Sequence, residues 1–79
     1  MNQLKATALL EGKNLGVRPS ITDYADASEG VAGFRVHLQG ANINLAKEVH
    51  AAVQQQAIDE GLAIQTKLYP GEIRVYWKV

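Results

Sequence analysis

The sequence predicts a small α+β fold, in which an antiparallel sheet of about four strands packs on one amphipathic helix. Three observations lead to this fold class. Apolar residues recur at helical spacing over roughly residues 43–60, and they alternate with polar residues over 34–39 and 62–79. The chain has 79 residues, which suits a single domain over residues 1–79. We expect the order strand, strand, helix, strand, strand along this domain.

The helix is the clearest element, and we expect it over roughly residues 43–60. Its apolar stripe is formed by Leu45, Ala46, Val49, Ala52, Val53 and Ala57. Asn42 or Asn44 is suited to begin the helix, because an Asn side chain accepts hydrogen bonds from the unpaired N–H groups of the first turn. Gly61 is suited to end it in a left-handed conformation, with Leu62 folding back onto the last turn.

A hairpin is expected after the helix, with its turn at Pro70-Gly71. Proline fixes one φ angle of such a turn, and the glycine is expected to adopt a positive one. The apolar side of the hairpin contains Leu62, Ile64, Leu68, Ile73, Val75, Trp77 and Val79. If Tyr69 lies opposite Glu72, the pairs that follow are Leu68–Ile73 and Ile64–Trp77 on one face, and Lys67–Arg74 and Gln65–Tyr76 on the other.

Two further strands are expected before the helix. One covers residues 34–39 and ends at Gly40, and the other covers 21–24 and enters a turn over 25–30.

The first ten residues fit either a strand or a helix. The residues that alternate as in a strand are Leu4, Ala6, Ala8 and Leu10. In a helix, Leu9 and Leu10 would point away from Leu4, so we favour a strand, with a helix over residues 2–11 as the alternative. A flexible connection is then predicted by Gly12, Gly16 and Pro19.

Composition narrows the class of protein. Eight basic and eight acidic residues cancel, whereas a protein that binds nucleic-acid phosphates commonly carries a basic excess. The chain has no cysteine, which excludes disulfides and thiolate metal ligands. It shows no internal repeat, no signal peptide and no apolar run of about 20 residues, so we expect a cytoplasmic protein that does not enter a membrane.

One face of the predicted sheet is left uncovered by the helix. The side chains expected on it are Arg35, His37, Lys67, Tyr69, Arg74, Tyr76 and Lys78. Cations interleaved with tyrosines are typical of surfaces on which bases stack while Lys and Arg contact phosphates. The same residue types also occupy the solvated face of an ordinary antiparallel sheet. The acidic residues are expected elsewhere, at Asp23, Asp26, Glu29, Glu48, Asp59 and Glu60.

Patterns that indicate catalysis or metal binding are weak. The sequence has no phosphate-binding glycine loop, no nucleophile elbow and no zinc-binding His-Glu motif. His50 lies at the edge of the helix stripe and is expected to pack, and His37 has no neighbouring metal ligands. A ribonuclease-like scheme can be drawn for His37 with Arg35, but their spacing does not single it out. We therefore expect no catalytic residue, no metal and no cofactor, and we do not expect an enzyme.

Two features indicate a protein partner. Ile58 lies outside the helix stripe, near Ala51 and Lys47, where another chain can dock. A small open sheet also has unpaired edge strands, which can add a strand from a second molecule in a homodimer or a hetero-complex.

The leading hypothesis is a non-catalytic binding protein that docks on a protein partner. The small size, the neutral charge and the lack of catalytic motifs resemble, in kind, compact accessory or inhibitor proteins of bacteria and their phages. The alternative is a nucleic-acid-binding module that uses the uncovered sheet face. A small ribonuclease-like enzyme ranks third.

Overall fold

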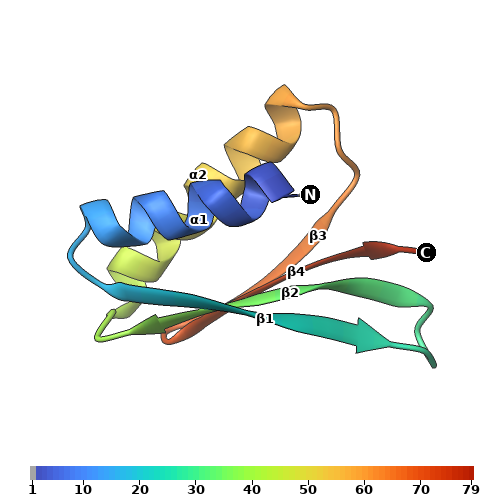
Figure 1. The fold of residues 1–79 in the computed structure, drawn as a ribbon, viewed down its shortest axis with the longest axis horizontal. Coiled ribbons are helices and arrows are strands. Elements are labelled where there is room, and N and C mark those ends of the chain that lie inside the picture. Colours follow the sequence, from blue (N-terminus) through green and yellow to red (C-terminus); the bar gives the residue numbers. More distant parts are fainter. Residues whose placement is uncertain (1) are drawn as a thin grey trace.

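The chain folds into two helices that lie on one face of a four-stranded antiparallel sheet (Figure 1). The computed structural model describes residues 2–79. Along the chain, the elements are α1 (Asn2–Asn14), β1 (Arg18–Asp26), β2 (Val31–Gln39), α2 (Ile43–Asp59), β3 (Gln65–Tyr69) and β4 (Glu72–Lys78). The α+β class and the four strands are as predicted, but a second helix is present. Neither of the two described helices is long and apolar enough to cross a membrane.

The order of elements repeats once, because each helix is followed by a hairpin. The strands are neighbours in the order β1-β2-β4-β3, so the two hairpins meet in the middle of the sheet along β2 and β4. In that central pairing, Phe34 lies opposite Val75 and Val36 lies opposite Ile73. Both hairpins therefore contribute a strand to the apolar centre of the sheet, and the edges are β1 and β3.

The strand predicted over residues 4–10 is wrong, because this segment belongs to helix α1. Its buried residues are Leu4, Ala8 and Gly12, which are spaced by four, while Leu10 is 62% exposed. This stripe is narrow, and the alternation of leucine and alanine fits a strand equally well. The predicted flexible connection is likewise absent from the described residues: Gly12 lies inside the helix and Gly16 follows it with a φ of 79°.

Helix α2 confirms the predicted helix to within one residue at its end. Asn42 begins it, since its side-chain oxygen accepts a hydrogen bond from the N–H of Leu45 at 2.9 Å. Gly61 ends it with a φ of 67°, and the N–H of Leu62 donates to the carbonyl oxygen of Ala57 at 2.9 Å. This fold-back pulls residues 62–64 toward the helix.

The hairpin of β3 and β4 has the predicted register, with Tyr69 opposite Glu72 and Lys67 opposite Arg74. The predicted pair of Ile64 with Trp77 is wrong, because β3 begins only at Gln65. The preceding residues leave the sheet to reach the end of α2, where the N–H of Leu62 is bonded. The turn also differs from the prediction, since Gly71 does not have a positive φ.

The hairpin of β1 and β2 is longer than predicted. β1 begins at Arg18, so Pro19 belongs to a strand. An edge strand tolerates proline, because one side of its backbone needs no hydrogen bond. The turn that follows is held by Asp26, whose Oδ1 accepts hydrogen bonds from the backbone N–H of Ser28 at 3.0 Å and from its hydroxyl at 2.6 Å.

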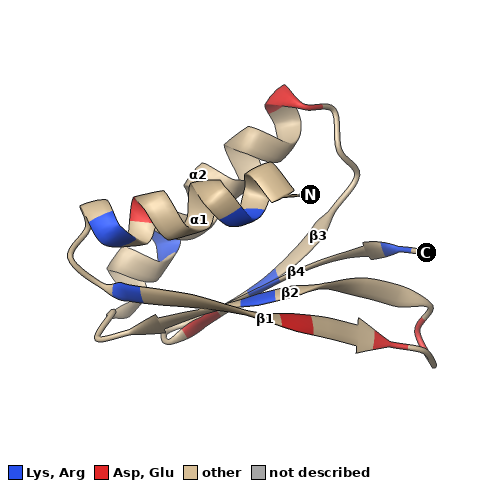
Figure 2. Cartoon of the chain, in the orientation of Figure 1, with Lys and Arg blue, Asp and Glu red and all other residues tan. Residues whose placement is uncertain are grey.

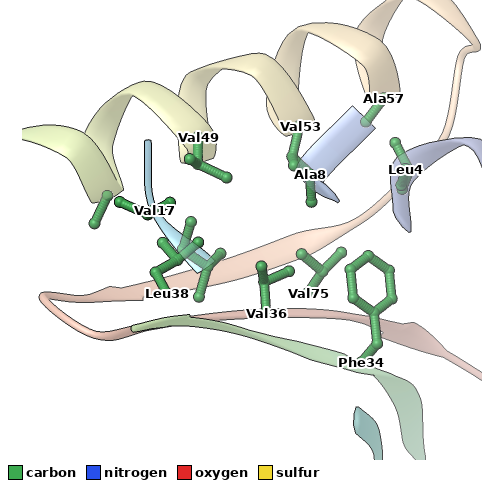
Figure 3. Packing of buried hydrophobic residues seen from close by; sticks show 12 residues of the cluster. Leu4, Ala8, Val17, Phe34, Val36, Leu38, Val49, Val53, Ala57 and Val75 are labelled. Carbon is green, nitrogen blue, oxygen red and sulfur yellow. The ribbon is translucent and has the colours of Figure 1, made fainter. Parts of the chain in front are cut away.

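The core lies between the helices and the inner face of the sheet (Figure 3). α1 contributes Leu4 and Ala8, and α2 contributes Ala46, Val49, Val53 and Ala57. The fully buried side chains of the sheet are Phe34, Val36, Leu38, Ile73 and Val75. Because both helices cover this face, the opposite face of the sheet has no helix on it (Figure 1).

Candidate functional site

The sheet face opposite the helices, here called the open face, carries most of the polar side chains of the strands. Its central strands present Val31, Gly33, Arg35, His37 and Gln39 from β2, and Glu72, Arg74, Tyr76 and Lys78 from β4. Its edges present Arg18, Ser20, Thr22, Tyr24 and Asp26 from β1, and Gln65, Lys67 and Tyr69 from β3. The structure thus brings the predicted residues of the uncovered face together: Arg35, His37, Lys67, Tyr69, Arg74, Tyr76 and Lys78. What they bind stays a prediction.

The strand registers arrange the open face in rows that cross the sheet. The aromatic row is Tyr24, Gly33, Tyr76 and Gln65, and the cationic row beside it is Thr22, Arg35, Arg74 and Lys67. The next row is Ser20, His37, Glu72 and Tyr69. Successive rows lie about 7 Å apart, because they are separated by two residues of a strand.

In the aromatic row, two tyrosine rings meet across a glycine. The ring centroids of Tyr24 and Tyr76 are 6.1 Å apart, with the rings at 63° to one another. Gly33 lies between them, and a Cβ at this position would collide with the carbonyl oxygen of Val75. Tyr24 was not among the predicted residues of this face, although alternation from the inward-facing Ile21 places it there.

The arginines of the cationic row lie against the tyrosines. The Arg35 guanidinium carbon is 5.4 Å from the ring centroid of Tyr24, and that of Arg74 is 5.8 Å from Tyr24 and 5.3 Å from Tyr69. These distances are typical of cation–π contacts. The buried Nε of Arg35 has no hydrogen-bond partner among residues 2–79. Arg35 also forms no ion pair with a carboxylate among these described residues.

His37, Glu72 and Arg74 form a cluster beside the cationic row. Glu72 Oε2 accepts a hydrogen bond from Arg74 Nε at 2.7 Å, and Glu72 Oε1 lies 3.7 Å from His37 Nδ1. The second ring nitrogen of His37 lies 2.9 Å from the Thr22 hydroxyl. The hydrogen bond to Glu72 raises the pKa of Arg74. Glu72 was not among the predicted site residues, because only its pairing opposite His37 in β2 brings it there.

A hollow of 210 Å³ opens on the open face next to the aromatic row. It is lined by Tyr24, Asp26, Glu29, Val31, Gln65, Lys67, Tyr76 and Lys78. Asp26 and Glu29 were expected away from this face, but both line the hollow, because β1 extends to Asp26 and Glu29 lies in the turn that follows. The Ser28 hydroxyl lowers the pKa of Asp26 by hydrogen bonding to its carboxylate, so Asp26 is an anionic acceptor at neutral pH.

Figure 2 shows Lys and Arg on all four strands and acidic residues on the helices and around the turn after β1. The strand registers assign these charges to the two faces of the sheet, and the division is uneven. The cations of the open face are Arg18, Arg35, Lys67, Arg74 and Lys78, and its anions are Asp26 and Glu72. Five cations against two anions give the strands of the open face a formal charge of +3, and Glu29 of the β1–β2 turn, which lines the hollow, lowers the charge of this face to +2. Since the whole chain is neutral, its other residues together carry the opposite charge.

The second histidine has a packing role. His50 Nε2 lies 2.6 Å from the hydroxyl of Thr66 on β3, which joins α2 to the sheet. Partial burial lowers the pKa of His50. In the part of the chain described, no three side chains of His, Asp or Glu come together as they would around a metal ion.

The residues predicted to dock a protein, Lys47, Ala51 and Ile58, are exposed on α2, on the helical side of the sheet. Ile58 is 71% exposed and is the one large apolar side chain of the three. An isolated exposed isoleucine is common on protein surfaces. Docking of a partner at this site stays a prediction.

Comparisons of the chain with protein families, with characterised proteins and with solved structures find no match. What the chain does must therefore be inferred from its own surface, and the open face carries five of its eight Lys and Arg residues.

Proposed function

We propose that the chain binds single-stranded nucleic acid on its open face. The observation that carries this proposal is the adjacency of an aromatic row and a cationic row on a sheet face that no helix covers. Tyrosine rings provide surfaces on which bases stack, and Arg and Lys neutralise phosphates. This ranks the nucleic-acid hypothesis above protein docking, for which α2 offers two exposed large apolar residues, Ile43 and Ile58, at its opposite ends.

The spacing of the rows favours a single strand over a duplex. Successive rows are about 7 Å apart, whereas nucleotides along one strand of a duplex rise by about 3.4 Å. A strand that crosses the rows is therefore extended, and its unstacked bases are free to contact rings. Bases in a duplex are already stacked on one another and offer no free faces to a flat surface.

The hollow beside the aromatic row suits one base. The rings of Tyr24 and Tyr76 border it on the apolar side, and Asp26, Gln65 and Lys67 offer acceptors and donors to base edges. A base held there has its phosphate near Arg35 or Lys67, one row away.

The neutral net charge is compatible with this function, because the charge is segregated. The phosphate backbone contacts the positive open face, while the opposite charge lies on the helices and on β1 residue Asp23. Affinity of this kind depends on the local density of cations rather than on their total.

The direct test is fluorescence polarisation with a labelled 12-nucleotide single strand of mixed sequence. We expect binding that weakens steeply between about 50 and 200 mM salt. Lys67→Gln should make the slope of log binding constant against log salt concentration shallower by about one, because one phosphate contact is lost. Tyr76→Leu should weaken binding by about 5- to 100-fold, which is the effect of losing one stacked base.

Lys13→Gln and Lys47→Gln are matched controls, because both lysines are exposed on helices. They should bind as the unmodified chain does. Absence of binding at 50 mM salt, or an equal effect of the helical and open-face variants, would refute the proposal.

A further inference from the structure

The cluster of His37, Glu72 and Arg74 contains groups that binding alone does not require. A carboxylate and an imidazole contribute little to phosphate affinity, and Glu72 places a negative charge beside the cationic row. We infer that this cluster cleaves RNA at the strand bound to the open face. The inference rests on the proposed function, because the substrate must first bind there.

RNA can be cleaved without a metal or a cofactor, because the nucleophile belongs to the substrate. A base removes the proton of the 2′-hydroxyl, and the 2′-oxygen forms a bond to the adjacent phosphorus. The bond from phosphorus to the 5′-oxygen breaks, and an acid gives this oxygen a proton. The products are a 2′,3′-cyclic phosphate and a 5′-hydroxyl. The protein must supply one base, one acid and cations for the charged phosphorane oxygens.

The cluster holds one group for each of these roles. Glu72 Oε2 is bonded to Arg74, so Oε1 is the oxygen available as the base. His37 has the role of the acid, and its Nδ1 lies 3.7 Å from this Oε1. That separation is longer than a hydrogen bond, so the two groups are neighbours without being locked to each other.

The cations for the transition state lie in the adjacent row. Arg74 is directly opposite Arg35 in the pairing of β2 with β4, and Lys67 is opposite Arg74 in the pairing with β3. Three cations thus cross the sheet next to the pair of His37 and Glu72. A phosphate on this row presents its ester oxygens to the acid and the base.

The cluster also has a defined relation to the hollow. The cationic row separates the aromatic row from the row of His37 and Glu72. A nucleotide whose base occupies the hollow therefore places its neighbouring phosphate on the cationic row, within reach of the cluster. Cleavage is expected next to the base that the hollow holds.

The test uses three labelled 12-nucleotide strands of one sequence: RNA, DNA, and RNA with every 2′-hydroxyl methylated. Each is incubated with the full chain in EDTA, resolved on a denaturing gel and analysed by mass spectrometry. Only the unmodified RNA should be cut, and its fragments should end in 2′,3′-cyclic phosphate. Polarisation should show that all three bind.

Glu72→Gln and His37→Asn should each slow cleavage by about 100-fold or more, the usual effect of removing a general acid or base. Their affinity for the methylated RNA should stay within about threefold of the unmodified chain, and circular dichroism should show the same fold. Lys47→Gln, purified identically, should cleave at the full rate.

Intact RNA in the presence of normal binding would overturn the cleavage inference and leave the proposed function standing. Absence of binding to all three strands would overturn both. Cleavage by Glu72→Gln and His37→Asn at the rate of the unmodified chain would also overturn the inference, because the activity would not come from this cluster. Cleavage of the methylated strand would do the same, because that strand has no 2′-hydroxyl to act as the nucleophile.

Discussion

The two histidines show how the surroundings of a residue decide its role. His50 lies between α2 and β3, where it contacts the hydroxyl of Thr66, and its partial burial disfavours the charged imidazolium. His37 lies on the open face, where Glu72 Oε1 is 3.7 Å from its Nδ1. The first histidine is suited to packing, whereas the second lies on the open face beside a carboxylate and a hydroxyl.

The lowered pKa of His50 predicts that stability depends on pH. In the unfolded chain His50 takes up a proton near its ordinary pKa of 6.5, and in the folded chain it does so only at lower pH. The unfolded state therefore binds more protons below this value, and the free energy of unfolding should fall from pH about 7.5 to about 5.5. Urea denaturation at the two pH values measures this change.

His50→Gln is the control for this pH effect. Because glutamine does not titrate, the fall in unfolding free energy between the two pH values should be smaller in the variant. An equal or larger fall would show that His50 is not its source.

Most single residues of the open face could be predicted, because alternation within a recognised strand divides its residues between two faces. Alternation within 34–39 and 65–78 placed Arg35, Lys67 and Tyr76 on one face, as the structure shows. Tyr24 was missed although the strand predicted over 21–24 contains it, because that strand was not assigned a face. The position of Glu72 beside His37 depends on which strands are neighbours, and alternation carries no information about that.

Among the elements, α2 and the second hairpin were predicted because strong local signals mark their ends. Asn42 begins the helix, Gly61 ends it, and Pro70-Gly71 separates two alternating segments. Helix α1 lacks such signals, since its buried stripe contains one leucine and two small residues. Its identity depends on the space beside α2 over β1 and β2, which no local pattern describes.

Helix α1 gives a prediction at the scale of the element. Leu4 is fully buried in the core, so Leu4→Ala should lower the free energy of unfolding by about 2–5 kcal/mol. Leu10, on the same helix, is 62% exposed, so Leu10→Ala should change it by less than about 0.5 kcal/mol. Urea denaturation of both variants measures the difference.

Equal effects of these two substitutions would contradict the helix. In a strand, Leu4 and Leu10 would lie on the same face and would be buried to a similar extent. The comparison therefore separates the observed α1 from the strand that alternation favoured.

At the scale of the whole molecule, the layers separate packing from surface chemistry. Both helices cover the apolar face of the sheet (Figure 1), whose side chains form the core (Figure 3), and most polar side chains of the strands lie on the other face. The strand order β1-β2-β4-β3 places β2 and β4 at the centre, and with them Arg35, His37, Glu72 and Arg74. Sequence patterns predicted which residues lie on each face of the sheet, but they could not predict the order of the strands. Each hairpin has two edge strands, and either can pair with the other hairpin.

The central claim is that the open face is where the chain contacts nucleic acid. Its most direct test is an NMR titration of the ¹⁵N-labelled chain with the 12-nucleotide single strand, following every backbone amide. The account predicts that shifts concentrate on β1, β2, β3 and β4 around Tyr24, Arg35, Lys67 and Tyr76, with little change along the exposed side of α2. Shifts centred on Lys47, Ala51 and Ile58, or no shifts at all, would contradict it.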